Sequence, residues 1–157
     1  MKLLNKVAFI TGAGQGMGRA IVRYFAGQGA IVVAADINLE AARQTIEGLG
    51  DKALAVSCNV ADSDSVASAM AAVYAQFARF DILVNNAGIG SIDAFADTPD
   101  EHWQRVIGVN LTGPFFCSRE AVKLMLKDGT RGVVINISST AALTGEGPGH
   151  YCAAKAG

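Results

Sequence analysis

The chain has 157 residues, 51% of them hydrophobic, and a formal net charge of −1. This balanced charge excludes the strongly basic surface that would indicate a nucleic-acid partner. Three cysteines with no Cys-x-x-Cys spacing give no basis for a disulfide framework or a zinc site. We find neither a leader pattern nor an apolar stretch long enough to span a membrane, and we therefore expect a cytoplasmic protein without a membrane partner or a metal.

Apolar runs alternate with helical patterns along the chain, which predicts a parallel β-sheet covered by helices on both faces. The expected strands lie near 6–11, 31–36, 53–58, 81–85 and 132–138. The expected helices lie near 17–28, 39–49, 63–78, 99–126 and from about 149 onward. Because we find no linker, repeat or low-complexity tract, we predict one α/β domain over residues 1–157.

Two helix starts have capping signals. Asp62 or Ser63 can cap the helix from 63. Thr98, followed by a proline and then by Glu101, predicts a capping box at the start of the helix from 99.

A glycine-rich turn follows the first strand and opens the first helix. Its missing side chains let the backbone approach a pyrophosphate, and the start of the helix offers unpaired N–H groups and a positive dipole end to that group. The turn predicts a dinucleotide site, although its glycine spacing differs from GxGxxG. The residues assigned to this site are Gly12, Gln15, Gly16, Met17 and Gly18.

An acidic residue, Asp36, closes the second strand about twenty residues after the glycine turn, where a ribose-binding carboxylate is expected. A carboxylate there accepts from the adenosine 2′-hydroxyl and repels a 2′-phosphate, which favours NAD over NADP. The alternative is that Asp36 merely begins the next helix; the combination of strand, glycines and acid argues against it. Arg19, just inside the first helix, is a cation that opposes this preference.

Tyr151 and Lys155 are four residues apart on the last expected helix. Side chains at this spacing share a helix face, so the lysine ammonium would favour the ionised phenol. An ordinary tyrosine has a pKa near about 10. To lower this pKa to near 7, the surroundings must stabilise the phenolate by roughly 4 kcal/mol. Alone, such a pair usually belongs to a solvated helix face; the motifs upstream favour a proton-transfer role.

Together the motifs resemble those of the short-chain dehydrogenase/reductase family. They are TGxxxGxG at Thr11 to Gly18, NNAG at Asn85 to Gly88, an asparagine at Asn110, a serine at 138–139, and YxxxK at Tyr151 to Lys155, in family order. The resemblance implies a Rossmann-type, doubly wound parallel sheet of order 3-2-1-4-5-6-7. This chain supplies strands 1 to 5 and lacks strands 6 and 7, so we expect an N-terminal portion truncated just after YxxxK. If the polypeptide does end at residue 157, we expect an association-prone apolar edge at strand five and low solubility.

The resemblance also implies roles for individual residues. Tyr151 would be the general acid/base, Lys155 would also hold the nicotinamide ribose with Tyr151, and Asn110 would anchor a proton-relay water. The alternative for Asn110 is a buried side chain that binds backbone. Further cofactor contacts would come from the ends of strands three and four: Asn59, which replaces the usual Asp, Val60, Asn86, Ala87 and Gly88.

The substrate-binding serine is one of two neighbours. Counting back from Tyr151 favours Ser138, whereas aligning forward from the strand favours Ser139 and implies a one-residue deletion in the loop at 145–150. We assign Ser139, because loops absorb deletions more readily than strand ends change register.

The function that the resemblance implies is an NAD-dependent oxidoreductase that transfers hydride between nicotinamide and a secondary alcohol or ketone. One alternative is an NADP-dependent enzyme like 3-oxoacyl-acyl-carrier-protein reductase, against which Asp36 argues. The other is a catalytically inactive dinucleotide-binding fragment. In the family, the helices that hold Asn110 and Tyr151 pair between subunits, which implies a homodimer or homotetramer in the full-length form.

Overall fold

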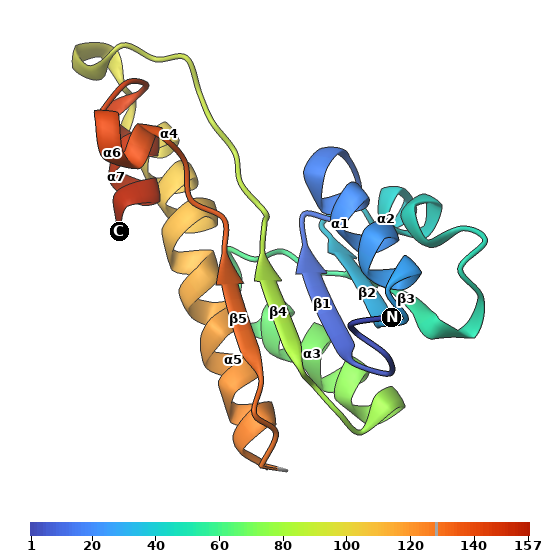
Figure 1. Ribbon diagram of the computed structural model, residues 1–157. Helices are drawn as coiled ribbons and strands as arrows, with labels where there is room; N and C mark the ends of the chain where they lie inside the picture. The colour runs from blue at the N-terminus through green and yellow to red at the C-terminus, as the bar shows by residue number, and fades with distance from the viewer. Residues whose placement is uncertain (128) are drawn as a thin grey trace.

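The computed structural model describes residues 1–127 and 129–157. A parallel sheet of order β3-β2-β1-β4-β5 forms its centre (Figure 1). The order confirms the expected arrangement of the first five strands. It places the carboxyl ends of all strands at one edge, where α/β proteins bind their ligands. The strands are β1 Val7–Thr11, β2 Ile31–Asp36, β3 Ala53–Ser57, β4 Ile82–Asn85 and β5 Val133–Asn136.

Helices cover both faces of the sheet (Figure 1). One face carries α1 (Gly16–Gly27) and α2 (Leu39–Ile46), and the other carries α3 (Ser63–Phe77) and α5 (Gly113–Lys127). Beyond the carboxyl ends of β4 and β5 lie three short helices, α4 (Asp100–Ile107), α6 (Ala141–Thr144) and α7 (Gly149–Ala156). The sequence patterns did not predict α6 or the two 3₁₀ turns, Gly50–Lys52 and Phe95–Asp97.

Each face of the sheet has its own apolar core. Along β1, Phe9 faces the α3/α5 layer and Ile10 faces the α1/α2 layer, as the alternation of a strand requires. The Phe9 ring lies 5.9 Å from that of Phe80, centroid to centroid. Both rings are fully buried, and burial of such a side chain contributes about 1.5–3 kcal/mol. The continuous apolar runs of β1, β2 and β4 are therefore explained by burial on both sides, whereas β5 is largely exposed.

A buried carboxylate joins the starts of β1 and β4. Asp81 accepts from Arg79 Nε at 2.6 Å, from Lys6 Nζ at 3.0 Å and from the Val7 N–H at 3.0 Å. Burial by itself would raise the pKa of Asp81, but the hydrogen bonds from these three partners outweigh it, so the pKa is lowered. The ionised carboxylate thus anchors the amino ends of two central strands.

The helix expected over 99–126 is interrupted. It consists of α4, a five-residue π-helical turn at Gly108–Thr112, and α5. The predicted capping box is wrong, because the N-cap is Pro99 and the Thr98 hydroxyl instead donates to the Ala94 carbonyl at 3.0 Å. The cap predicted at Asp62 is confirmed, since its Oδ1 accepts from the backbone N–H of Asp64 at 2.9 Å.

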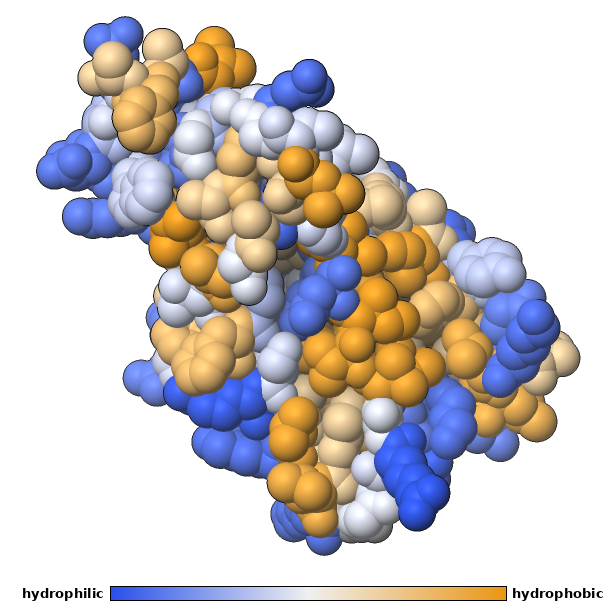
Figure 2. All heavy atoms as spheres, turned by 60° about the vertical axis from the view of Figure 1, so that its left-hand side comes forward, coloured by the Kyte–Doolittle hydropathy of each residue, from blue (hydrophilic) through white to orange (hydrophobic). Residues whose placement is uncertain are grey.

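Apolar side chains gather on the side of the molecule that carries β5 and α5 (Figure 2). Strand β5 pairs with β4 along one edge, and in the part of the chain that the structure describes no strand pairs with the other edge. Val133 on β5 is 53% exposed. None of the described helices has the length and apolar character that a membrane span needs.

Candidate active site

The glycine turn between β1 and α1 shapes the floor of a cleft. Gly12 has a φ of +62°, and a Cβ there would lie 2.7 Å from the Ala87 Cα; a Cβ on Gly18 would collide with the Gly12 carbonyl oxygen. Gly16 has a φ of +52°, and within the described residues a Cβ on it would meet nothing within 4 Å. The first and last glycines therefore permit close packing, whereas Gly16 leaves backbone open to the cleft.

The first turn of α1 faces the same cleft. Its N-cap is Gln15, whose side chain makes no capping hydrogen bond to any described residue. The leading N–H groups of a helix have no partners within the helix. Uncapped, they can bind an anion, and the positive end of the helix dipole favours a pyrophosphate at this position.

Two of the sequence motifs are joined by hydrogen bonds. The buried Thr11 hydroxyl accepts from the N–H groups of Asn86 and Ala87, each at 3.0 Å, and donates to the Val84 carbonyl at 3.3 Å. In return, Asn86 Nδ2 donates to the carbonyls of Thr11 at 2.9 Å and Gly12 at 3.1 Å. Thr11 and Asn86 thus hold the glycine turn against the end of β4, a role that the motif pattern did not identify for Thr11.

Asp36 lies in the cleft wall with both carboxylate oxygens hydrogen-bonded. Oδ2 accepts from the Gly14 N–H at 2.8 Å, and Oδ1 accepts from the Asn38 N–H at 2.9 Å. The N-cap of α2 is Asn38, so Asp36 does not begin that helix. A carboxylate has about four acceptor positions, so these two bonds leave capacity for ribose hydroxyl groups.

Arg19, the cation that opposes the predicted preference for NAD, makes hydrogen bonds to other parts of the chain. Its Nη2 donates to the Gly14 carbonyl, and its Nε donates to the Thr45 hydroxyl at 3.1 Å. Thr45 is fully buried and donates in turn to the Ala13 carbonyl at 2.7 Å. The guanidinium therefore supports the glycine turn from α1 and α2.

A cavity of about 750 Å³ contains the predicted dinucleotide site. Every predicted cofactor residue outside α7 lines it, including Gln15, Met17, Asn59, Val60 and Gly88. Its volume is in the range of small-molecule and cofactor sites. The open glycine backbone, the uncapped helix start and the acid make these residues fit a dinucleotide. The cavity also includes residues that no motif indicated, among them Ile37, Gln104 and Arg105.

The Tyr151–Lys155 pair lies on α7, close to the ends of β4 and β5. Lys155 Nζ donates to the Ile137 carbonyl at 2.9 Å and lies 5.9 Å from the centroid of the Tyr151 ring. Burial lowers the pKa of Lys155. A Cβ on Gly88 would lie 3.4 Å from Asn110 Oδ1 and 3.5 Å from Lys155 Nζ. The glycine thus lets the end of β4, the π-helical turn and α7 approach one another.

Asn110 is 4% exposed and lies in the π-helical turn. Its Oδ1 accepts from the Ile89 N–H at 2.8 Å, and its Nδ2 donates to the Ile89 carbonyl at 2.7 Å. The side chain thus binds backbone, as the alternative interpretation had it. The π-helical turn carries Asn110 at the point where the long helix meets the Ile89 backbone. Such turns are frequent at functional sites.

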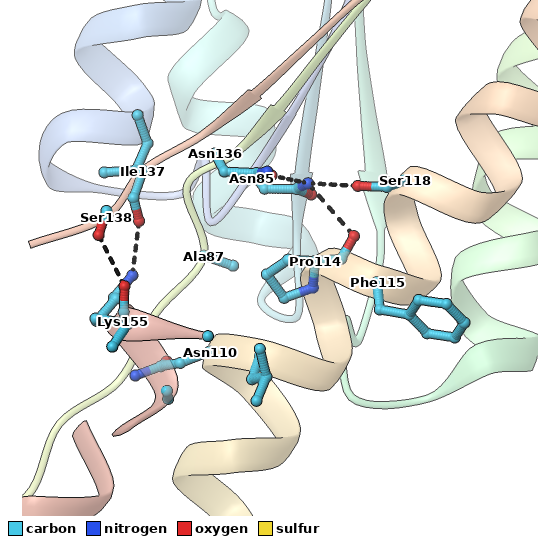
Figure 3. Close-up of a pocket in the computed structure, with 14 residues that line it drawn as sticks. Asn85, Ala87, Asn110, Pro114, Phe115, Ser118, Asn136, Ile137, Ser138 and Lys155 are labelled. Carbon is cyan, nitrogen blue, oxygen red and sulfur yellow. Dashed lines mark hydrogen bonds between the residues drawn. The ribbon is translucent and has the colours of Figure 1, made fainter. Parts of the chain in front are cut away.

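The two candidate serines have different partners. The Ser138 hydroxyl donates to the Lys155 backbone carbonyl at 2.8 Å (Figure 3). Ser139 Oγ accepts from the Ala141 N–H at 3.2 Å, and no described residue is recorded as an acceptor for its hydroxyl hydrogen. Of the two hydroxyl groups, that of Ser139 therefore keeps its proton available for a substrate oxygen.

A second cavity of about 370 Å³ lies between α5, β5 and α7 (Figure 3). It contains a polar cluster around the buried Asn85, whose Nδ2 donates to Asn136 Oδ1 at 2.8 Å and to the Ser118 hydroxyl at 3.1 Å. Asn85 Oδ1 is buried without a hydrogen-bond partner among the described residues. This cluster links β4, β5 and α5 beside α7.

The cysteines are free thiols in different environments. Burial, together with the nearby Asp36 and Asp62, raises the pKa of Cys58 to about 11, and burial raises that of Cys117 to about 12. Within the described ranges, no group of three or more histidines, cysteines or acids is placed to hold a metal ion.

The fold is that of a doubly wound α/β protein, with a cavity that fits a dinucleotide at the carboxyl ends of its strands and a Tyr-Lys pair nearby. Residues 6–157 match the family model described as short chain dehydrogenase, and the chain belongs to this family.

Individual relatives agree. The chain is 41% identical to meso-2,3-butanediol dehydrogenase of Serratia marcescens over 157 residues, which is 99% of this chain and 62% of that protein. It is 38% identical to 3-oxoacyl-acyl-carrier-protein reductase of Thermotoga maritima, covering all of this chain and 65% of the reductase. The crystal structure of gox2181 superposes with a TM-score of 0.94 at 34% identity, over 99% of this chain and 63% of that one. The chain thus spans less than two thirds of the length of these relatives.

Proposed function

We propose that the chain is the cofactor-binding and proton-transferring part of an NAD-dependent oxidoreductase that interconverts a secondary alcohol and a ketone. The observation that carries the proposal is the close approach of Lys155 Nζ and Asn110 Oδ1, which line the second cavity, to Gly88, which lines the dinucleotide cavity. This contact supports assigning the Tyr-Lys pair and the dinucleotide cavity to one site. The names of the relatives, dehydrogenases and reductases, support the same class of reaction.

Cofactor binding is assigned to three parts of the cleft. The glycine turn and the uncapped start of α1 hold the pyrophosphate, and the carboxylate of Asp36 accepts from the adenosine ribose hydroxyls. Asn59 and Val60 contact the adenine ring after β3, and Ala87 and Gly88 leave room for the cofactor after β4. The chemistry that bound NAD supplies is hydride exchange with the carbinol carbon.

Proton transfer is assigned to Tyr151. As general acid/base, its phenol gives a proton to the ketone oxygen or takes one from the alcohol. Lys155 Nζ lies 5.9 Å from the centroid of the Tyr151 ring, so its charge is close to the group that exchanges the proton.

Ser139 and Asn110 have supporting roles in this proposal. The free hydroxyl proton of Ser139 is donated to the substrate oxygen and orients it toward the Tyr151 phenol. The amide of Asn110 keeps one further N–H and one lone pair beyond its bonds to Ile89, and these can hold a water that relays the proton from Lys155.

The preference for NAD over NADP rests on two observations. Asp36 lies where a 2′-phosphate would be, and the Arg19 guanidinium already donates to Thr45 and Gly14. The reductase among the relatives supports an NADP-dependent 3-oxoacyl-acyl-carrier-protein reductase as the second candidate.

For the whole protein we propose a homodimer or homotetramer that is joined through α5. An exposed apolar stripe on that helix, formed by Phe115, Val122 and Leu126, supports such a contact.

The test is a fluorescence titration of NADH and NADPH, followed by turnover of a vicinal diol, a polyol and a 3-oxoacyl thioester. We expect tighter binding of NADH and oxidation of an alcohol. Tyr151→Phe should lower kcat by about 10²-fold or more, because it removes the exchangeable proton. Tighter binding of NADPH would contradict the role of Asp36. NADH binding with no turnover would favour the inactive dinucleotide-binding alternative.

A further inference from the structure

A line of hydrogen-bonded side chains runs from the protein surface to the residue that precedes Tyr151. His150 is 1% exposed, and its Nε2 lies 2.5 Å from the Ser91 hydroxyl oxygen. The Ser91 hydroxyl also lies near Asp93 and lowers the pKa of that carboxyl. Asp93 Oδ2 lies 2.8 Å from Nδ1 of His102, which is half-exposed on α4. Sequence patterns linked none of these four side chains to one another.

One member of this line carries a charge. Its contacts with Ser91 and His102 lower the pKa of Asp93, so its carboxylate is ionised and only accepts. His150 shares one hydrogen bond with the Ser91 hydroxyl through its Nε2. Its Nδ1 is buried and has no hydrogen-bond partner among residues 1–127 and 129–157.

Helix α7 depends on such tertiary contacts. It has only eight residues, and its N-cap, Pro148, makes no side-chain capping bond to any described residue. A helix this short is marginal in isolation. Phe95 packs against its first residue, since a Cβ on Gly149 would lie 2.6 Å from Phe95 Cδ2. The bond from His150 to Ser91 is the polar anchor of the turn that carries Tyr151.

The anchor leads back to the cofactor cleft. Ser91 belongs to the segment that follows the cleft residues Ala87 and Gly88, and Asn110 holds the same segment through Ile89. Within this segment, Ile89 is therefore hydrogen-bonded to the π-helical turn and Ser91 to α7. The position of the Tyr151 phenol relative to the cleft depends on both hydrogen bonds.

We propose that His150 is a positioning residue, which fixes the first turn of α7, and with it the Tyr151 phenol, against the cleft through its bond to Ser91. The inference rests on the proposed function for the role of Tyr151, but the bond itself does not. The substitution His150→Gln retains an N–H donor near the Nε2 position, whereas His150→Leu removes it at similar volume. Cys152→Ser, on the other side of Tyr151, is the matched control for a change beside the phenol.

The first experiment needs no turnover. In the ¹⁵N-histidine-labelled protein with NADH, we expect Ser91→Ala to shift the ring-nitrogen resonances of His150. The ¹³Cζ resonance of Tyr151 should move in His150→Leu and return toward its original position in His150→Gln. His150 resonances that Ser91→Ala does not shift, or a Tyr151 resonance that His150→Leu does not move, would overturn the inference even if the protein catalyses nothing.

The kinetic experiment uses the same variants. We expect His150→Leu to lower kcat at least tenfold while NADH affinity stays within twofold, and His150→Gln and Cys152→Ser to stay within threefold of the unmodified protein. A His150→Gln variant as slow as His150→Leu, with both folded, would show that bulk rather than the hydrogen bond matters and would refute the inference. Absence of turnover in the unmodified protein would refute the proposed function instead, and the spectra would decide the role of His150.

Discussion

Removing the Thr11 hydroxyl should uncouple the glycine turn from the end of β4. Thr11→Val keeps the shape of the side chain but removes an oxygen that accepts from two N–H groups and donates to one carbonyl. The Asn86 N–H also bonds to the Val84 carbonyl at 3.1 Å, so it keeps a partner, whereas Ala87 loses the only one recorded among the described residues. The Ala87 N–H is only part-buried, so we place its loss at the lower end of the about 1–3 kcal/mol that an unsatisfied buried N–H costs. With the weaker losses at the other two groups, we expect the free energy of unfolding to fall by about 1–2 kcal/mol.

Denaturant unfolding of Thr11→Val, with Thr11→Ser as the control that keeps the hydroxyl, measures this loss. Because the same bonds set the distance between the glycine turn and the Asn86 segment, the affinity for NADH should fall by about tenfold, equivalent to about 1.4 kcal/mol. Thr11→Ser should retain most of both. An unfolding midpoint and an NADH affinity of Thr11→Val equal to those of the unmodified protein would show that these bonds do not hold the cleft together.

Three further outcomes follow from the same contacts. Asp81→Asn should cost about 2–3 kcal/mol at pH 7. Because the folded state lowers the pKa of Asp81, its stabilisation is present above the unfolded value near about 4 and is lost as the pH falls through the folded value; a difference between the two proteins that grows on acidification would contradict this. Gly14→Ala would place a Cβ 2.9 Å from the Asp36 Cγ, so it should weaken NADH binding as measured by fluorescence, and unchanged binding would disprove the close approach. At pH 8, iodoacetamide should label Cys152 well before the two buried cysteines, whose pKa values are raised to about 11 and about 12; mass spectrometry that finds equal labelling would refute their burial.

The residues that the sequence assigns to the cofactor come together in the structure because they follow strand ends. In a parallel sheet, the segments after each strand meet at one edge. The glycine turn after β1, Asp36 at the end of β2, Asn59 after β3 and Gly88 after β4 therefore had to converge, and they line one cavity. Hydrophobic runs and turn residues, which are local features, were sufficient for this result.

The helix before β5 was predicted less well, because its shape depends on a distant partner. The pattern over 99–126 is that of one helix, but Asn110 reaches inward to the backbone of Ile89, 21 residues earlier, through a π-helical turn. The capping box failed for a local reason, since the Thr98 hydroxyl donates to the Ala94 carbonyl four residues earlier.

By itself, the sequence determined the order of strands and helices, the glycine turn, the acid after β2 and the Tyr-Lys pair, because each depends on the spacing of neighbouring residues. Only the tertiary structure decided which side chains hold these parts in place. The bond between Thr11 and Asn86 spans 75 residues, that between Ser91 and His150 spans 59, and that between Gly14 and Asp36 spans 22. Such bonds form between groups that become neighbours when the sheet packs against its helices, and no local pattern encodes their distance or direction.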